Sequence, residues 1–445
     1  MKGLVNLRFG KLQTHFVKNG IALRVSLLFS ISVAIVFFYR LGSARVDKGQ
    51  QPGLRDIATY IDAGANLLNG NDPYLDANYR AGPSLLFFFG LVAKIGNPYL
   101  IAWFFQLMVM VGIAYFTKII ADLAFSKHVL FYCIILFLSS TRENLVNIQI
   151  TGFLALLFAL GIKLSTSYED KNLCRTYLGL LFVGIAVDTK PHIFLLTSVI
   201  IFISRKQFSK LLVCFLAICF IHLIESLKYS GFITLSWLKQ LVHLNEKRIN
   251  GSLGESIFLS WIFEILGIDS SAATFVLLAT CLILSFFIIM ISLRRDVVRE
   301  EIAFSLLIPS FGIFFHYYDL VLAICVYLAI LYGKQSRLFP YLSLFFVVPE
   351  SVGDFKSILV ILMVTVINLF MFEWKFAMIK HILLALLLWF SYGFFLSVLP
   401  ETISIHSFQM TFTVIILATI SLNQLMFCKY EANDKTIVST VSRDR

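Results

Sequence analysis

The chemically active side chains near the N-terminal end lie in one polar stretch, residues 55–83, which reads RDIATYIDAGANLLNGNDPYLDANYRAGP. Its acidic residues are Asp56, Asp62, Asp72 and Asp76. The segments on both sides are almost entirely apolar. A carboxylate at a membrane surface could accept the proton of an attacking hydroxyl group. We therefore expect one of these acids to do chemistry there.

Asp56 is the candidate that stands at the start of an expected helix, residues 56–68, which Gly70 ends. A carboxylate there suits the exposed amides and the positive end of the helix dipole, so a capping role explains it as well as a catalytic one. Tyr60, four residues on, shares the face of Asp56. The apolar face is expected to point toward the membrane; its members are Ile57, Ile61, Gly64, Leu67 and Leu68.

Composition assigns the chain to the helical membrane proteins. Apolar residues make up 59% of the 445, and Phe occurs 45 times. The mean hydropathy is +0.85. Lipid must solvate that much apolar surface, and runs such as residues 131–138 lack the alternation of a barrel strand. The fold class is therefore all-α and polytopic. The net charge of +11 reflects basic cytoplasmic loops, and no nucleic-acid partner is expected.

The positive-inside rule orients the chain. Residues 21–39 read as an uncleaved signal anchor whose basic N-terminus is cytoplasmic. Two short apolar segments, 84–95 and 256–266, read as interfacial helices on the outer surface, because counting them as spans would put basic clusters outside. About 12–14 transmembrane helices follow, with expected spans near residues 129–141, 191–204 and 271–292 among them. Residues 1–427 form one membrane domain, with a module at about 20–333, C-terminal helices at about 338–427 and a cytoplasmic tail at 428–445.

This topology gathers the remaining unusual polar residues on the outer face. They are Arg142, Glu143, Asn144, Gln149, Asp188, Lys190, His192, His243, Lys247, Arg248, Asn250, His316, Tyr317, Tyr318 and Asp319. The seven cysteines are scattered, and neither Cys/His spacing nor paired carboxylates indicates a metal site. We expect no disulfide framework and no metal cofactor.

The motifs resemble those of the bacterial polyprenol-phosphate-mannose-dependent mannosyltransferases, which belong to the GT-C class of integral-membrane glycosyltransferases. The first-loop pattern is Asp56-x3-Tyr60-x3-Gly64-x2-Leu67-Leu68-x-Gly70-x-Asp72-Pro73-Tyr74. In the family's order follow Asn147-Ile148-Gln149, the stretch from Gly179 to Lys190-Pro191, Asn250-Gly251-Ser252, and Pro309-x6-His316-Tyr317. Two positions depart from the family: Gly82 replaces the first of two prolines, and Ile148 replaces a glycine.

The resemblance implies an inverting transfer from a polyprenyl-monophosphate sugar to a glycolipid or glycan acceptor, at the outer side of the inner (plasma) membrane. Asp56 would be the general base. Lys190 and His316, with Arg142 and Arg248, would bind the donor phosphate, although snorkelling or interfacial packing also explains Lys190 and His316. Tyr60, Gln149, Asn250 and Tyr317 would bind substrate. Mannose is the family's usual sugar.

Two other functions remain open from the residues. A flippase or transporter of lipid-linked sugars would need polar residues at the membrane midplane, and none lies securely there. A polymerase or ligase acting on diphosphate-linked glycans would rely on outer-loop arginines rather than on a first-loop aspartate. The site, rather than the fold, must separate these functions.

Overall fold

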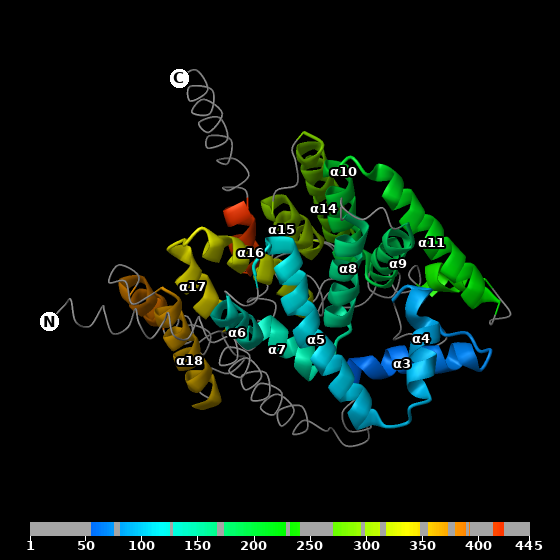
Figure 1. Cartoon of the computed structure of the whole chain (residues 1–445), viewed down its shortest axis with the longest axis horizontal. Helices are drawn as coiled ribbons and strands as arrows, with labels where there is room; N and C mark the ends of the chain where they lie inside the picture. Colours follow the sequence, from blue (N-terminus) through cyan, green and yellow to red (C-terminus); the bar gives the residue numbers. More distant parts are fainter. Residues whose placement is uncertain are drawn as a thin grey trace.

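The computed structural model describes residues 55–74, 81–124, 128–166, 173–227, 232–240, 270–294, 299–311, 317–347, 355–372, 379–388, 391 and 413–421. Within these ranges every regular element is helical, which confirms the all-α prediction (Figure 1). The first half contains α3 (Arg55–Leu68), η1 (Pro83–Leu85), α4 (Leu86–Ala93), α5 (Pro98–Ala121), α6 (Val129–Phe137), α7 (Ser139–Val146), α8 (Thr151–Thr166), α9 (Leu173–Thr189), α10 (Pro191–Ser204) and α11 (Phe208–Ser226). The second contains α14 (Ser270–Ser292), α15 (Arg299–Leu307), η2 (Ile308–Phe311), η3 (Tyr317–Leu320), α16 (Val321–Gly333), α17 (Leu338–Phe345) and α18 (Phe355–Met371). Residues 233–240, 379–388 and 413–421 are also helical.

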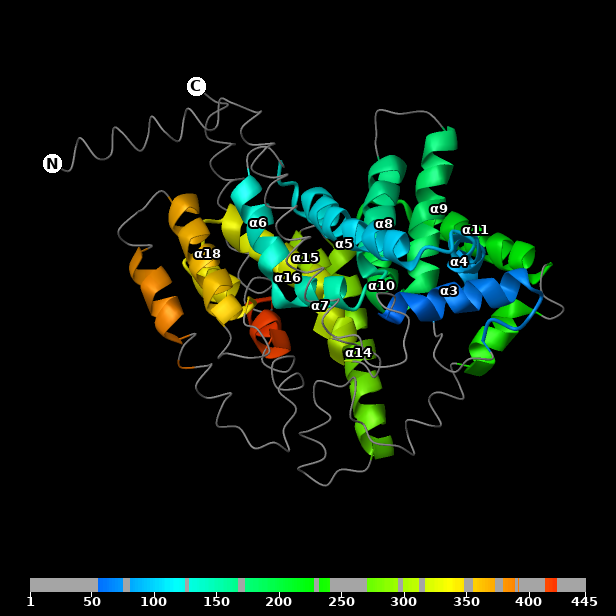
Figure 2. The same ribbon diagram turned by 90° about the horizontal axis from the view of Figure 1, so that it is seen from below.

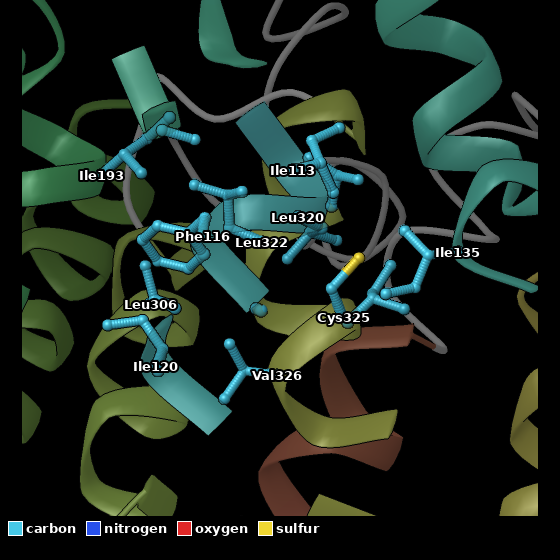
Figure 3. Packing of buried hydrophobic residues seen from close by; sticks show 14 of the residues in the cluster. Ile113, Phe116, Ile120, Ile135, Ile193, Leu306, Leu320, Leu322, Cys325 and Val326 are labelled. Atoms are coloured by element: carbon cyan, nitrogen blue, oxygen red, sulfur yellow. The ribbon is translucent and has the colours of Figure 1, made fainter. Parts of the chain in front are cut away.

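The centre of the molecule is α16, which is apolar on every side. All its residues from Val321 to Leu331 are buried, none more than 4% exposed. A helix that is apolar all round must be enclosed by others. Here α5, α15, α17 and α6 pack against it; Figure 3 shows Phe116 and Ile120 of α5 facing Leu322 and Val326.

Two helices carry the opposite pattern, since their large apolar side chains point outward. In α11, Phe208, Phe215 and Phe220 are 61–65% exposed. In α14, which extends away from the bundle in Figure 2, Leu282 and Ile283 are similarly exposed. Water would penalise apolar patches of this size, whereas lipid would solvate them.

By length and composition, two described helices could cross a membrane: Leu100–Ala121 and Phe208–Ser226. A third span arises if Val129–Phe137 and Ser139–Val146 count as one, bent by 63°. The other apolar helices are shorter: the 16 residues of α8 extend about 24 Å. The number of 12–14 crossings and the domain division stay predictions. The expected anchor 21–39 and the expected interfacial helix 256–266 lie outside the described residues.

The apolar face of α3 does not point toward lipid, so that prediction is wrong. Ile57, Ile61 and Leu67 are buried in the protein. The cause is a glycine pair: a Cβ on Gly64 would lie 2.3 Å from the backbone nitrogen of Gly90 in α4. Only glycine permits so close a helix crossing. The segment 84–95 forms η1 and α4, and α4 packs on α3, while Phe87 and Leu91 of α4 are exposed. Its interfacial position stays a prediction.

Candidate functional site

Asp56 lies in the first turn of α3 and faces another part of the chain. Its carboxylate accepts a hydrogen bond from the side-chain amide of Gln149, 93 residues away. The side chain of Asp56 is half-buried. The amide of Gln149 holds this carboxylate against the start of α8. Asp56 therefore does more than start a helix.

The turn between α7 and α8 positions Gln149. The backbone N–H of Gln149 donates to the carbonyl of Asn144 (2.9 Å), while Ile148 adopts a left-handed conformation with φ of 49°. That conformation is strained for a β-branched residue and suits glycine. The departure at Ile148 thus keeps a turn of the kind that glycine forms easily. The side chain of Ile148 is buried, and this burial offsets part of the strain.

Lys190 lies at the reversal between α9 and α10. Pro191 disfavours helical geometry at the residue before it, and Lys190 is not helical, with φ of −134° and ψ of 73°. α9 therefore ends there, and the lysine side chain turns into the protein. Lys190 is only 6% exposed. This degree of burial argues against simple snorkelling of its ammonium into water.

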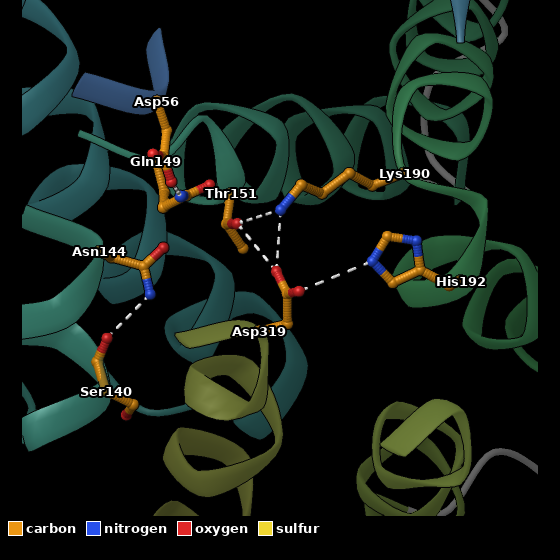
Figure 4. Close-up of polar contacts among 8 residues, drawn as sticks. All are labelled: Asp56, Ser140, Asn144, Gln149, Thr151, Lys190, His192 and Asp319. Atoms are coloured by element: carbon orange, nitrogen blue, oxygen red, sulfur yellow. Dashed lines mark hydrogen bonds and ion pairs between the residues drawn. The ribbon is translucent and has the colours of Figure 1, made fainter. Parts of the chain in front are cut away.

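The ammonium of Lys190 belongs to a network that we name the Lys190 cluster: Thr151, Lys190, His192 and Asp319. Lys190 Nζ lies 2.8 Å from Asp319 Oδ1 and 2.9 Å from Thr151 Oγ1. His192 Nε2 lies 3.7 Å from Asp319 Oδ2. The cluster is shown in Figure 4. Burial of the charges requires such pairing.

The Asp56–Gln149 pair and the Lys190 cluster form one site. Gln149 and Thr151 are two residues apart, and Figure 4 shows the Asp56–Gln149 pair next to Thr151 and Lys190. The site thus joins α3, the start of α8, the α9–α10 reversal and η3. A potential base and a potential anion-binding cation stand together, as group transfer from a phosphate would require.

The remaining predicted residues lie elsewhere or outside the described ranges. Tyr60 packs on Phe89, with ring centroids 5.3 Å apart, and Arg142 pairs with Glu143 at 3.7 Å. Of Tyr317, the first residue of η3, only the backbone is described. The other three predicted residues lie outside the described residues: Arg248, Asn250 and His316.

Asp188, two residues before Lys190, belongs to a second network, which we name the Asp188 cluster: Ser84, Asp188, His222 and Thr234. Asp188 Oδ2 accepts the backbone N–H of Ser84 (2.9 Å), and Oδ1 lies 3.1 Å from His222 Nε2. His222 Nδ1 lies 2.9 Å from Thr234 Oγ1. The carboxylate of Asp188 thus contacts a backbone N–H through one oxygen and an imidazole through the other.

The Asp188 cluster explains the departure at Gly82. The N–H of Gly82 donates to the carbonyl of Thr189 (3.4 Å), which brings the end of the first loop onto α9. A Cβ at Gly82 would lie 2.2 Å from the backbone oxygen of Asp188. No proline ring fits this contact, and a proline would also lack the donor N–H.

The sequence predicted the segments that form the site, but it did not predict which side chains pair with one another there. Thr151, Asp188, His192, His222 and Asp319 received no role, although Asp188, His192 and Asp319 stood out as polar residues between apolar runs. Their position beside Lys190-Pro191 and His316-Tyr317 was the available signal. His222 and Thr151 gave none, because each lies within an apolar helix.

Among the described residues, no group of three or more His, Cys, Asp or Glu side chains could hold a metal ion. The expected independence of metal stays a prediction.

Neither the known protein families, nor the curated proteins, nor the solved structures contain a match to this chain.

Proposed function

We propose that the chain is an integral-membrane glycosyltransferase. It takes a sugar, mannose by its motifs, from a polyprenyl-monophosphate donor and transfers it to a glycolipid or glycan acceptor at the outer face of the inner membrane. The observation that carries the proposal is the single site formed by Asp56 with Gln149 and by Lys190 with Asp319. It contains the two functional groups that such a transfer needs.

In this reaction the acceptor hydroxyl oxygen attacks the anomeric carbon, and a new glycosidic bond forms. The bond from that carbon to the phosphate oxygen breaks, and its electron pair stays on the lipid phosphate. Asp56 accepts the hydroxyl proton, and Gln149 holds the carboxylate in place for this step. Lys190 stabilises the negative charge that grows on the phosphate. Attack from the opposite side inverts the anomeric carbon.

The exposed apolar faces of α11 and α14 support a lipid surround for the site. A polyprenyl chain could lie among such helices while its phosphate reaches the Lys190 cluster. The low dielectric near a membrane edge strengthens the attraction between ammonium and phosphate. The monophosphate leaving group carries less charge than a diphosphate, so the proposal involves no metal ion.

The test uses purified protein in lipid nanodiscs with a panel of radiolabelled polyprenyl-phosphate sugars, namely mannose, glucose and arabinose. Label should pass from one of them into extractable glycolipid or glycan, and excess EDTA should not stop it. Asp56→Asn should reduce the rate by about 10²–10⁴. Asp62→Asn is the matched control, since Asp62 lies on the same helix and is exposed.

Three outcomes would contradict the proposal in different ways. Absence of transfer from every donor would reject the glycosyltransferase, and movement of intact donor across the bilayer would indicate a flippase instead. Near wild-type turnover by Asp56→Asn would place the base elsewhere. Loss of activity in EDTA that returns with Mg²⁺ or Mn²⁺ would make Asp56 a metal ligand.

A further inference from the structure

We propose that the Asp319 carboxylate occupies the place at Lys190 that the lipid phosphate takes during transfer. Asp319 and the phosphate would then compete for one ammonium group, and Asp319 would promote release of the polyprenyl monophosphate product. The inference rests on the proposed function and adds to it a residue that controls the exit of the leaving group.

The geometry supports a competitor. Lys190 Nζ lies 2.8 Å from Asp319 Oδ1, and both side chains are nearly closed to solvent, at 8% and 2% exposure. A carboxylate oxygen and a phosphate oxygen are the same class of partner for an ammonium group. An anion that approaches Lys190 in this protein therefore meets a lysine that already holds an anion.

The charges of the donor and of the product determine at which stage the competition between Asp319 and the phosphate matters. The donor is a phosphodiester with one negative charge, whereas the product is a monoester with about −1.5 to −2 at neutral pH. When the anomeric C–O bond breaks, its electron pair adds this charge beside Lys190. The Asp319 carboxylate, held between Lys190 and His192, repels the extra charge. It also gives the lysine a partner to return to when the product leaves.

A purely positioning role for Asp319 makes the opposite prediction. If Asp319 only held Lys190 in place, its neutral replacement would loosen the lysine and weaken the binding of any phosphate. If Asp319 competes, the same replacement removes both the rival and the repulsion, and the phosphate binds more tightly. The sign of the change in product affinity separates the two.

The experiment measures binding of farnesyl monophosphate to full-length protein in nanodiscs, with farnesol and inorganic phosphate as probes for the lipid and the phosphate alone. Asp319→Asn should bind farnesyl monophosphate about tenfold more tightly than wild type, and kcat should fall because release slows. Asp319→Glu, which keeps the charge, should bind as wild type does. Asp62→Asn is the control for loss of an unrelated carboxylate. Unchanged or weaker binding by a folded Asp319→Asn protein would overturn the inference.

A second measurement needs no variant. Dicyclohexylcarbodiimide, an apolar reagent, joins a carboxylate to an amine in contact with it. In wild-type protein it should link the peptides that contain Lys190 and Asp319, and saturating farnesyl monophosphate should suppress that link. No link in the free protein, or a link that the phosphate leaves unchanged, would contradict the inference.

Failure of the inference is distinguishable from failure of the proposed function. Wild type that does not bind farnesyl monophosphate overturns both. Wild type that binds it through Lys190, while Asp319→Asn binds no more tightly, overturns the inference alone.

Discussion

Two charged residues of one helix reversal lead into two different networks. Asp188 and Lys190 are two residues apart, yet Asp188 contacts Ser84 and His222, while Lys190 contacts Thr151 and Asp319. The Asp188 cluster binds a backbone N–H and joins the first loop to α9 and α11. The Lys190 cluster holds a buried ammonium only through side chains. The Asp188 cluster therefore stabilises the fold around the site, whereas the Lys190 cluster belongs to the site.

The difference between the two clusters arises from how easily each hydrogen-bond donor can change its partner. The backbone N–H of Ser84 is buried, so breaking its contact with Asp188 leaves a buried donor unsatisfied. The ammonium of Lys190 can pass from one anion to another with little change in its own hydrogen bonding. Loss of Asp188 should therefore act on stability alone, whereas loss of Lys190 should act on transfer as well as on stability.

Among the substitutions that compare the two clusters, the largest effect should follow Lys190→Gln, which should reduce transfer by about 10²–10³, as expected for loss of one group that stabilises a growing anion. The single variant also leaves Asp319 buried without its counter-ion, which costs about 3–5 kcal/mol of stability. The double variant Lys190→Gln/Asp319→Asn removes both charges. It should regain thermal stability in detergent but not activity. If the double variant regains activity together with stability, the Lys190 cluster is structural, like the Asp188 cluster, and the two clusters do not differ in role.

Asp188→Ala should come next, with its effect on folding. It leaves the N–H of Ser84 and Nε2 of His222 without their acceptor, each at a cost of about 1–3 kcal/mol. The apparent midpoint of thermal unfolding should fall, and the remaining folded protein should transfer sugar at close to the wild-type rate per molecule. A large fall in kcat of well-folded protein would show that Asp188 takes part in the reaction.

Gly82→Ala should be destabilising by about 1–3 kcal/mol, because its Cβ would meet the backbone of Asp188 and force the two segments apart. Gly70→Ala is a useful comparison: Gly70 also needs glycine, for its φ of 77°, but nothing lies within 4 Å of a Cβ there. If the two substitutions lower thermal stability equally, crowding at Gly82 is not the cause.

Thr234→Val should have the smallest effect, about 1 kcal/mol, because it removes one hydrogen bond at Nδ1 of His222 and keeps the side-chain shape. Thermal unfolding should shift slightly and transfer should not change. A loss as large as that of Asp188→Ala would mean that Thr234, rather than the carboxylate, fixes His222.

The sequence was sufficient for most helix ends, because prolines and charges mark them. The segment 191–204 was predicted with the bounds that α10 has, and 271–292 differs from α14 by one residue. It was not sufficient where packing decides. Residues 129–141 were expected as one span, but α6 ends at Phe137, and α7 turns by 63° and contains Arg142.

The site shows the same difference between local signals, which the sequence contains, and long-range packing, which it does not reveal. The motifs brought Asp56, Gln149 and Lys190 forward from their local chemistry, and the structure brings these three into one site. The sequence could not assign Asp319 to Lys190, because the two are 129 residues apart and either could have paired with a nearer charge. The hydrogen bonds of Asp188 could not be predicted either, because its partners are far away in the sequence. Ser84 also contributes only its backbone N–H, which any residue but proline carries.

The separation of Lys190 from Asp319 also sets an order in time. A ribosome adds about 5–20 residues per second, so the 129 residues between them take roughly 6–26 seconds to make. The 34 residues between Asp188 and His222 take only about 2–7 seconds. During synthesis the contact between Asp188 and His222 can therefore form before Asp319, the partner of Lys190, has been made. Until residue 319 has been made, Lys190 lacks the carboxylate that balances its charge in the finished protein.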